Sequence, residues 1–241
     1  MKDKLVIVND NGEATIYIYE QIGGFLGVPV EDLVKEIAAL KVSTIHLRIN
    51  SPGGDVFDAR AIEAVIREHP ANVIAHIDGV AASSASFLAL AANQVEMGEG
   101  AFFMIHNAMA IARGNATALM EVAALLEKVD GSINGSYQRK TGLSEDQIRE
   151  WMNAETWFTA KEALEHGFID SIYENQKPDN VFNWDEFEYR NIPEALFESV
   201  ETKEEPTIEN EEVAEDEQEP VVEQQFDHAA NERLLELLKI M

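Results

Sequence analysis

A run of small residues joins a predicted strand to a predicted helix: Gly79-Val80-Ala81-Ala82-Ser83-Ser84-Ala85-Ser86-Phe87-Leu88. The strand-like segment ends near Asp78, and the helix-like segment covers residues 87–92. Small side chains let a backbone turn sharply and let another segment approach closely. A serine at such a turn presents its hydroxyl at a helix N-terminus, where N–H groups favour developing negative charge. Because serine is also a preferred N-cap residue, Ser83, Ser84 and Ser86 are equally open to a purely structural interpretation.

A second turn, Asn50-Ser51-Pro52-Gly53-Gly54-Asp55, closes the strand-like segment Ile45-His46-Leu47-Arg48-Ile49. Two adjacent glycines adopt backbone conformations that other residues avoid, and they can direct N–H groups toward a ligand. This arrangement suits an oxyanion hole. Pro-Gly more often marks an ordinary β-turn, so both interpretations stay open for this segment alone.

A histidine, His106, follows the strand-like segment Ala101-Phe102-Phe103-Met104-Ile105. Imidazole is the usual base for a serine hydroxyl. A lone histidine at the end of a strand is more often a structural residue, so His106 is a candidate only together with the serine turn. The other histidines lack this setting, because they lie within strand-like segments, near helix ends or in the C-terminal tail: His46, His76, His69, His166 and His228.

The order of strand-like and helix-like segments predicts an α/β fold over residues 1–176. The longest helix-like segment covers residues 116–139, with apolar residues at steps of three and four. A polar connector is expected over residues 177–197, followed by a disordered acidic linker over 198–228. Residues 229–241 form a short amphipathic helix in this interpretation, either a frayed tail or a docking or oligomerising helix.

The overall composition excludes several classes of function. A formal net charge of -27 argues against nucleic acid as a partner, because a phosphate backbone would be repelled. No apolar run is long enough for a membrane span, and the first residues lack the apolar core of a secretory signal. The chain has no cysteine, which excludes disulfides, thiolate–zinc sites and a cysteine nucleophile. A cytoplasmic protein that needs no metal or organic cofactor is the resulting expectation.

The three motifs resemble, in their order and approximate spacing, those of the Clp protease proteolytic subunit. The resemblance continues through Glu162-Ala163-Leu164-Glu165-His166-Gly167-Phe168-Ile169-Asp170 and covers roughly residues 15–173. It implies a fold that is a crotonase-like spiral of ββα units, with residues 116–139 as the handle helix. In this family the handle packs subunits into heptameric rings, and two rings stack around a chamber.

The resemblance also implies roles for individual residues. Ser83 matches the nucleophile and His106 the base. The amides of Gly53 and Ser84, with Gly54 in the same turn, match the oxyanion hole. The third member of the triad, an aspartate in the family, corresponds here to Glu155, which is one methylene longer. The chain departs from the family a second time at residues 84–85, where serine and alanine replace the methionine and glycine often found there.

The function implied is that of a serine endopeptidase acting on protein or peptide substrates inside a homo-oligomeric ring. No ATP-binding loop of the Gly-x-x-x-x-Gly-Lys-Ser/Thr type is present, so a housekeeping member would depend on a separate AAA+ ATPase. The short N-terminus and acidic tail also resemble the head-maturation proteases of tailed phages, for which a capsid or scaffold protein is the expected partner. The alternatives are a crotonase-like acyl-CoA enzyme and a catalytically silent ring or scaffold protein. A signal-peptide-peptidase-like enzyme is disfavoured, because it would need a serine–lysine pair and usually a membrane anchor.

Overall fold

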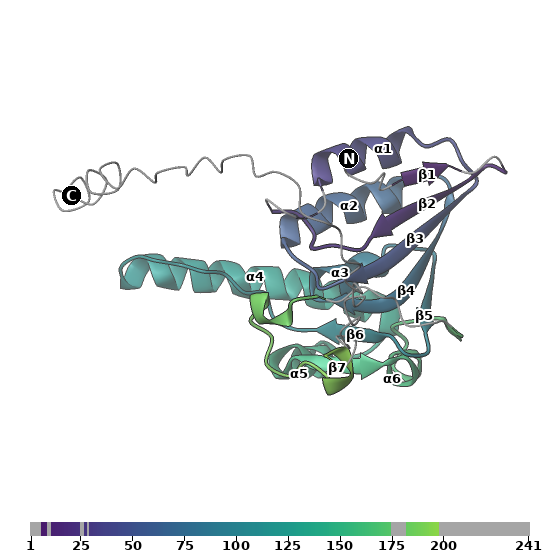
Figure 1. The fold of residues 1–241 in the computed structure, drawn as a ribbon. Helices are drawn as coiled ribbons and strands as arrows, with labels where there is room; N and C mark the ends of the chain where they lie inside the picture. Colours follow the sequence, from purple (N-terminus) through teal and green to yellow (C-terminus); the bar gives the residue numbers. More distant parts are fainter. Residues whose placement is uncertain (1–5, 9–10, 25–26, 28, 175–181, 198–241) are drawn as a thin grey trace, which may run out of the picture. The chain divides into compact units, whose positions relative to one another are not determined.

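The computed structural model describes residues 6–8, 11–24, 27, 29–174 and 182–197, with residues 6–8 described by their backbone alone (Figure 1). The chain divides into two units, Met1–Glu201 and Thr202–Met241, and every described residue belongs to the first. The acidic linker and terminal helix expected over residues 198–241 lie outside the described residues.

One mixed sheet forms the centre of the domain, with the strand order β1-β2-β3-β4-β5-β8 and with β6 pairing to both β4 and β7. Neighbouring strands run parallel except for β1 with β2 and β6 with β7. The strands are β1 (Val6–Val8), β2 (Glu13–Ile18), β3 (Thr44–Ser51), β4 (Asn72–Ala82), β5 (Gln94–Gly98), β6 (Phe102–Ile105), β7 (Thr156–Thr159) and β8 (Ser171–Tyr173). The expected α/β architecture is therefore confirmed, and most of its neighbouring strands are parallel.

The strand β4 is longer than expected, because it continues past Asp78 to Ala82. Its first half pairs with β3 and β5, and its last residues leave β5 and pair with β6 instead. Ala82 lies opposite Met104 in this register. Ser83 directly follows the end of β4, and His106 directly follows the end of β6. Because these two strands are paired, both residues lie at the same edge of the sheet.

The helices are α1 (Val30–Ala39), α2 (Val56–Glu68), α3 (Ser84–Ala89), α4 (Ala116–Thr141), α5 (Glu145–Ala154) and α6 (Ala160–Glu165), with short 3-10 turns at Trp184–Glu186 and Glu194–Leu196. α2 begins three residues before the expected start at residue 59, because Asp55 accepts hydrogen bonds from the amides of Phe57 and Asp58. α3 likewise begins at Ser84, earlier than the expected residue 87. The predicted capping box of Thr159 and Glu162 is present at the start of α6.

The long helix α4 extends away from the rest of the domain in Figure 1. Its buried residues, Ile133, Asn134, Ser136 and Tyr137, all lie in its C-terminal half. Three large apolar side chains in its N-terminal half are exposed: Leu119, Met120 and Leu125. None of the described helices combines the length and the apolar composition that a membrane span requires.

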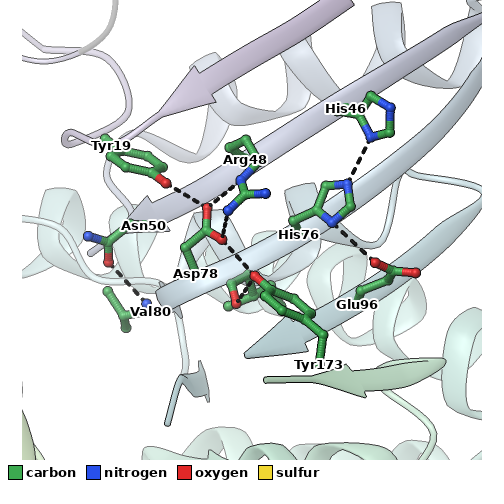
Figure 2. Close-up of polar contacts among 10 residues, drawn as sticks. Tyr19, His46, Arg48, Asn50, His76, Asp78, Val80, Glu96 and Tyr173 are labelled. Atoms are coloured by element: carbon green, nitrogen blue, oxygen red, sulfur yellow. Dashed lines mark hydrogen bonds and ion pairs between the residues drawn. The ribbon is translucent and has the colours of Figure 1, made fainter. Parts of the chain in front are cut away.

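A polar network on neighbouring strands centres on Asp78 (Figure 2). Arg48 forms an ion pair with this buried carboxylate, and the hydroxyls of Tyr19 and Tyr173 each donate to it at 2.6 Å. These contacts join β3, β4 and β8 to the segment after β2 without any part in the serine turn. The network is a source of strand-to-strand stability.

The connector expected over residues 177–197 is not merely polar. Residues 182–197, here named the C-terminal strap, pack apolar side chains against the ends of β4, β6 and β7. Trp184 is buried at their centre, and its ring meets that of Trp157 at 5.8 Å in an edge contact. The other members of this cluster are Val80, Ala82, Met104, Phe102, Phe182, Phe187, Tyr189, Ile192 and Leu196.

Candidate active site

Ser83 occupies a strained turn between β4 and α3. Its backbone lies at φ 54° and ψ -123°, a region that L-residues rarely adopt. Strain of this kind persists where the surrounding structure holds it, and here the Ser83 amide donates to the carbonyl of Met104 at 3.0 Å. A serine on a sharp strand-to-helix turn is the arrangement that exposes a nucleophilic hydroxyl.

The three serines of this turn have different environments. Ser86 is buried, and its hydroxyl bonds the Ser83 carbonyl at 2.5 Å and the Tyr137 hydroxyl at 2.7 Å. The Ser84 hydroxyl is buried without a hydrogen-bond partner among the described residues. Ser83 alone of the three contacts a base, so it is the one placed for nucleophilic chemistry.

His106 lies with its Nε2 atom 2.7 Å from the Ser83 hydroxyl oxygen. Its side chain is almost fully buried, and burial lowers the pKa of the imidazole to about 4, with Arg190 acting in the same direction and Glu155 against it. A neutral imidazole at hydrogen-bond distance can accept the serine proton. The sequence predicted this pair, and the structure brings its members together.

Glu155 is buried, 3% exposed, at the end of α5. Its Oε1 atom accepts hydrogen bonds from the backbone amides of Arg190 and Asn191, each at 2.7 Å, and from the indole of Trp157 at 3.4 Å. Within the described residues, no hydrogen bond joins Glu155 to His106. The carboxylate nevertheless acts on the imidazole through its charge, since it raises the pKa of His106.

The glycine turn lies directly against the serine turn. A Cβ atom on Gly53 would come within 2.6 Å of the Ala82 carbonyl oxygen and 2.7 Å of the Ser83 Cβ, so only glycine fits at this close approach. The Gly53 amide donates to the Ser51 hydroxyl at 3.2 Å. In the described part of the chain, the amides of Gly54 and Ser84 donate to no protein acceptor. Gly54 and Ser84, rather than Gly53, are therefore the amides with free donor capacity.

A cleft of about 460 Å³ opens at Ser83 and His106. Residues 54–57 form part of its lining, and α4 contributes apolar side chains that include Val122, Leu126 and Val129. The strap contributes residues 186–189. The arrangement suits an extended chain lying across the serine, with apolar contacts on the side of α4. The described residues contain no group of three or more histidine, aspartate or glutamate side chains arranged to hold a metal ion.

Tyr189 is a site residue that the sequence did not predict. Its hydroxyl donates to the Pro52 carbonyl at 2.5 Å, and its ring meets the His106 ring edge-on at 5.2 Å. The only signal in the sequence was the group of aromatic residues in a segment that otherwise reads as polar: Phe182, Trp184, Phe187 and Tyr189.

Comparison with known proteins gives a consistent assignment. The Clp protease family model matches residues 12–176. Proteolytic subunit 2 of the ATP-dependent Clp protease of Treponema denticola is 33% identical over 147 residues, which are 60% of this chain and 72% of that protein. Proteolytic subunit 1 from Prochlorococcus marinus is 29% identical over 65% of this chain and 85% of its own length. A ClpP1 mutant structure from Listeria monocytogenes matches 67% of this chain and 92% of its own, with a TM-score of 0.59 and 26% identity. The family resemblance and the fold expected from the motifs are confirmed.

Proposed function

Because this chain belongs to the Clp protease family, whose members are serine-type endopeptidases, we propose that Ser83 is its nucleophile and His106 its general base. The observation that carries the proposal is the 2.7 Å contact between the Ser83 hydroxyl and Nε2 of a buried histidine, at a strained turn beside a cleft. Burial lowers the pKa of His106 to about 4, so at neutral pH the ring is in the neutral form that a proton acceptor requires.

The reaction begins when the Ser83 oxygen attacks the carbonyl carbon of a peptide bond and His106 takes the hydroxyl proton. The carbonyl oxygen becomes an oxyanion, which the amides of Gly54 and Ser84 bind. His106 then returns the proton to the leaving amine, and an acyl ester on Ser83 remains. A water molecule activated by His106 hydrolyses the ester and restores both side chains. Glu155 is the third member of the triad in this scheme, where its charge stabilises the imidazolium.

The exposed apolar surface supports a homo-oligomeric state. Met109 and Ile111 are 52% and 98% exposed beside the cleft, and they are close in sequence to the exposed apolar side chains of α4. Met109, Ile111 and the α4 residue Leu125 line the same cleft, so they form one apolar surface, and a contiguous exposed apolar surface marks an interaction site. The ring assembly that the Clp protease family implies would cover them, with α4 as the handle between subunits.

Two kinds of partner protein are compatible with the proposed peptidase activity. The relatives are named as subunits of an ATP-dependent protease, which implies an AAA+ ATPase partner for a housekeeping role. The resemblance to phage head-maturation proteases implies a capsid or scaffold protein instead. Cleavage of a folded capsid or scaffold protein by the purified chain without ATP supports the second role, and cleavage that requires an added Clp ATPase and ATP supports the first.

The test of the catalytic proposal is labelling with a fluorophosphonate probe beside Ser83→Ala and His106→Ala variants. We expect labelling of the wild type alone, at Ser83, together with hydrolysis of unstructured peptides. Labelling that persists in Ser83→Ala would contradict the assignment. A folded wild-type oligomer that neither labels nor cleaves peptides would favour a silent ring or scaffold protein, and hydrolysis of an acyl-CoA thioester would favour the crotonase-like alternative.

A further inference from the structure

Three consecutive strap residues touch separate parts of the proposed active site. Tyr189 contacts the glycine turn and His106, while Arg190 and Asn191 contact Glu155. We propose that residues 189–191 are positioning residues, which hold Glu155 and the glycine turn in place from outside the family-matched region, residues 12–176. This inference rests on the proposed function, since it assigns work to the strap in the same reaction.

The carboxylate of Glu155 is buried and is contacted by the strap on both of its oxygens. A buried charge is tolerated only when it is paired and hydrogen-bonded. The two strap amides supply short bonds to a single oxygen, Oε1, and the Arg190 guanidinium lies 3.8 Å from the other oxygen, Oε2. Bonds from N–H groups to a charged acceptor are stronger than neutral ones. The strap therefore fixes the direction of the carboxylate and keeps its charge beside His106.

The backbone of Glu155 is strained and is contacted by Asn191. This residue lies at φ 52°, in the left-handed region that disfavours side chains larger than glycine. The Asn191 side-chain amide donates to the carbonyl of Ala154 at 2.8 Å and to that of Glu155 at 3.3 Å. Asn191 thus binds the strained residue through its side chain and its backbone together. Strain of this kind requires such support to persist.

The glycine turn is contacted by Tyr189. The Pro52 carbonyl that accepts the Tyr189 hydroxyl belongs to the same peptide unit as the Gly53 amide, which donates to the Ser51 hydroxyl. Both ends of this peptide are thereby fixed, and its orientation sets that of the next amide, Gly54. Burial raises the pKa of Tyr189, which keeps the hydroxyl protonated as a donor.

The strap is packed against the domain by its own apolar side chains, so residues 189–191 belong to an ordered segment. Trp184 is 4% exposed and packs among the aromatic side chains of the strap and Trp157. Burial of a large aromatic side chain, together with its ring–ring contacts, stabilises the packing of the segment that carries it. The apolar cluster therefore fixes the position of the strap, and the contacts of residues 189–191 orient Glu155 and the glycine turn.

The experiment compares Asn191→Ala and Tyr189→Phe with the wild type in the full chain. Asn191→Ala removes the side-chain hydrogen bonds to the carbonyls of Ala154 and Glu155. Tyr189→Phe removes the hydroxyl that donates to the Pro52 carbonyl and that also interacts with the Ser83 side chain. The matched control is Tyr173→Phe, which also deletes a single tyrosine hydroxyl, but one that contacts Asp78 and the Ile77 carbonyl in the Asp78 network (Figure 2). Each variant is measured for kcat and KM on a peptide and for the rate of fluorophosphonate labelling. Circular dichroism and sedimentation confirm that folding and assembly are retained.

We expect Asn191→Ala and Tyr189→Phe to lower kcat roughly tenfold with little change in KM, within the range measured for coupled residues in contact. Tyr173→Phe leaves kcat unchanged. The decisive measurement repeats Asn191→Ala in a Glu155→Gln background. If Asn191 acts through Glu155, the second substitution causes no further loss. Glu155→Ala serves as the background if Glu155→Gln fails to fold.

Two results would overturn the inference while leaving the proposed function intact. One is a wild type labelled at Ser83 whose kcat is unaffected by either strap substitution. The other is an Asn191→Ala loss of equal size in both backgrounds, which would show a structural effect independent of Glu155. A wild type that is folded but not labelled at Ser83 is a different failure, because it removes the proposed function and the strap's role with it.

Discussion

The pH dependence of Ser83 labelling follows from the surroundings of His106. Burial is the main cause that lowers the pKa of this ring to about 4, and the charge of Glu155 only partly opposes it. For an imidazole with the ordinary pKa of about 6.5, the neutral fraction falls about 30-fold between pH 8 and pH 5. With a pKa of about 4 it falls by only about a tenth over the same range. We therefore expect the labelling rate constant to change less than about twofold from neutral pH down to pH 5, once the intrinsic reactivity of the probe is corrected for.

The assay is the second-order rate constant of fluorophosphonate labelling between pH 5 and pH 8 at constant ionic strength. This range stays above the isoelectric point of about 4.4, near which the net charge vanishes and solubility falls. The rate at which the probe hydrolyses in buffer alone, measured at each pH, provides the correction. A tenfold or greater fall in rate between pH 7 and pH 5 in the folded oligomer would contradict this expectation, because it would mean that His106 titrates as a solvated ring.

The same pKa predicts how stability depends on pH. Between about pH 4 and pH 6.5, His106 is neutral in the folded chain but binds a proton when the chain unfolds. The unfolded state therefore binds more protons in this window, so the contribution of His106 rises with pH, is complete above pH 6.5 and is lost as the pH falls toward 4. The free energy of unfolding of the wild type, relative to His106→Gln, should rise by about 2 kcal/mol from pH 5 to pH 7. Urea unfolding at the two pH values measures this difference, and an equal pH dependence of both proteins would contradict it.

Three further substitutions test the packing around the site. Gly53→Ala should abolish labelling and lower stability by about 1–3 kcal/mol, because its Cβ would meet the Ala82 carbonyl at 2.6 Å; a labelled, fully stable variant would contradict this. Asp78→Ala should lower the free energy of unfolding in urea by about 2–3 kcal/mol. This is less than the loss of a fully buried ion pair, because the Arg48 side chain is 35% exposed. Labelling of the folded Asp78→Ala protein at Ser83 should be unchanged. Tyr137→Phe should cost about 1 kcal/mol in thermal unfolding, since the Ser86 hydroxyl keeps its second bond; a loss above about 3 kcal/mol would show a larger role.

The sequence predicts the elements whose signals are local. The helix-like segment 116–139 corresponds to α4, and the capping box of Thr159 forms as expected, because both depend on residues three or four positions apart. The early start of α2 depends on which residue accepts the first amides, and Asp55 was quoted only as part of a turn. The length of β4 depends on β6 taking over as its partner, which no pattern within β4 records.

The candidate site likewise contains residues that the sequence predicted and residues that it did not. Ser83 and His106 lie in recognisable turns, and the family spacing leads to Glu155. The residues that hold Glu155 are 35 and 36 positions away, and Tyr189 is 137 positions from Pro52. Two of these contacts use backbone amides, which every residue type except proline possesses, so side-chain identity carries no signal for them. The hydrogen-bonding state of the Gly53 amide is hidden for the same reason, since only the folded turn shows that Ser51 accepts it.

In the proposed site, the contacts of the strap favour a glutamate at position 155 over the aspartate that the family resemblance implies there. An aspartate at this position would be one methylene shorter, and its carboxylate could not keep both 2.7 Å contacts with strap amides without a shift of the backbone. That backbone is already confined to the left-handed region and bound by Asn191, so little shift is available. The longer side chain is therefore the one that fits the proposed site, where the carboxylate is held from outside the family-matched residues 12–176. The strap in turn accounts for how a buried glutamate, with no hydrogen bond to His106 among the described residues, stays close enough to raise its pKa.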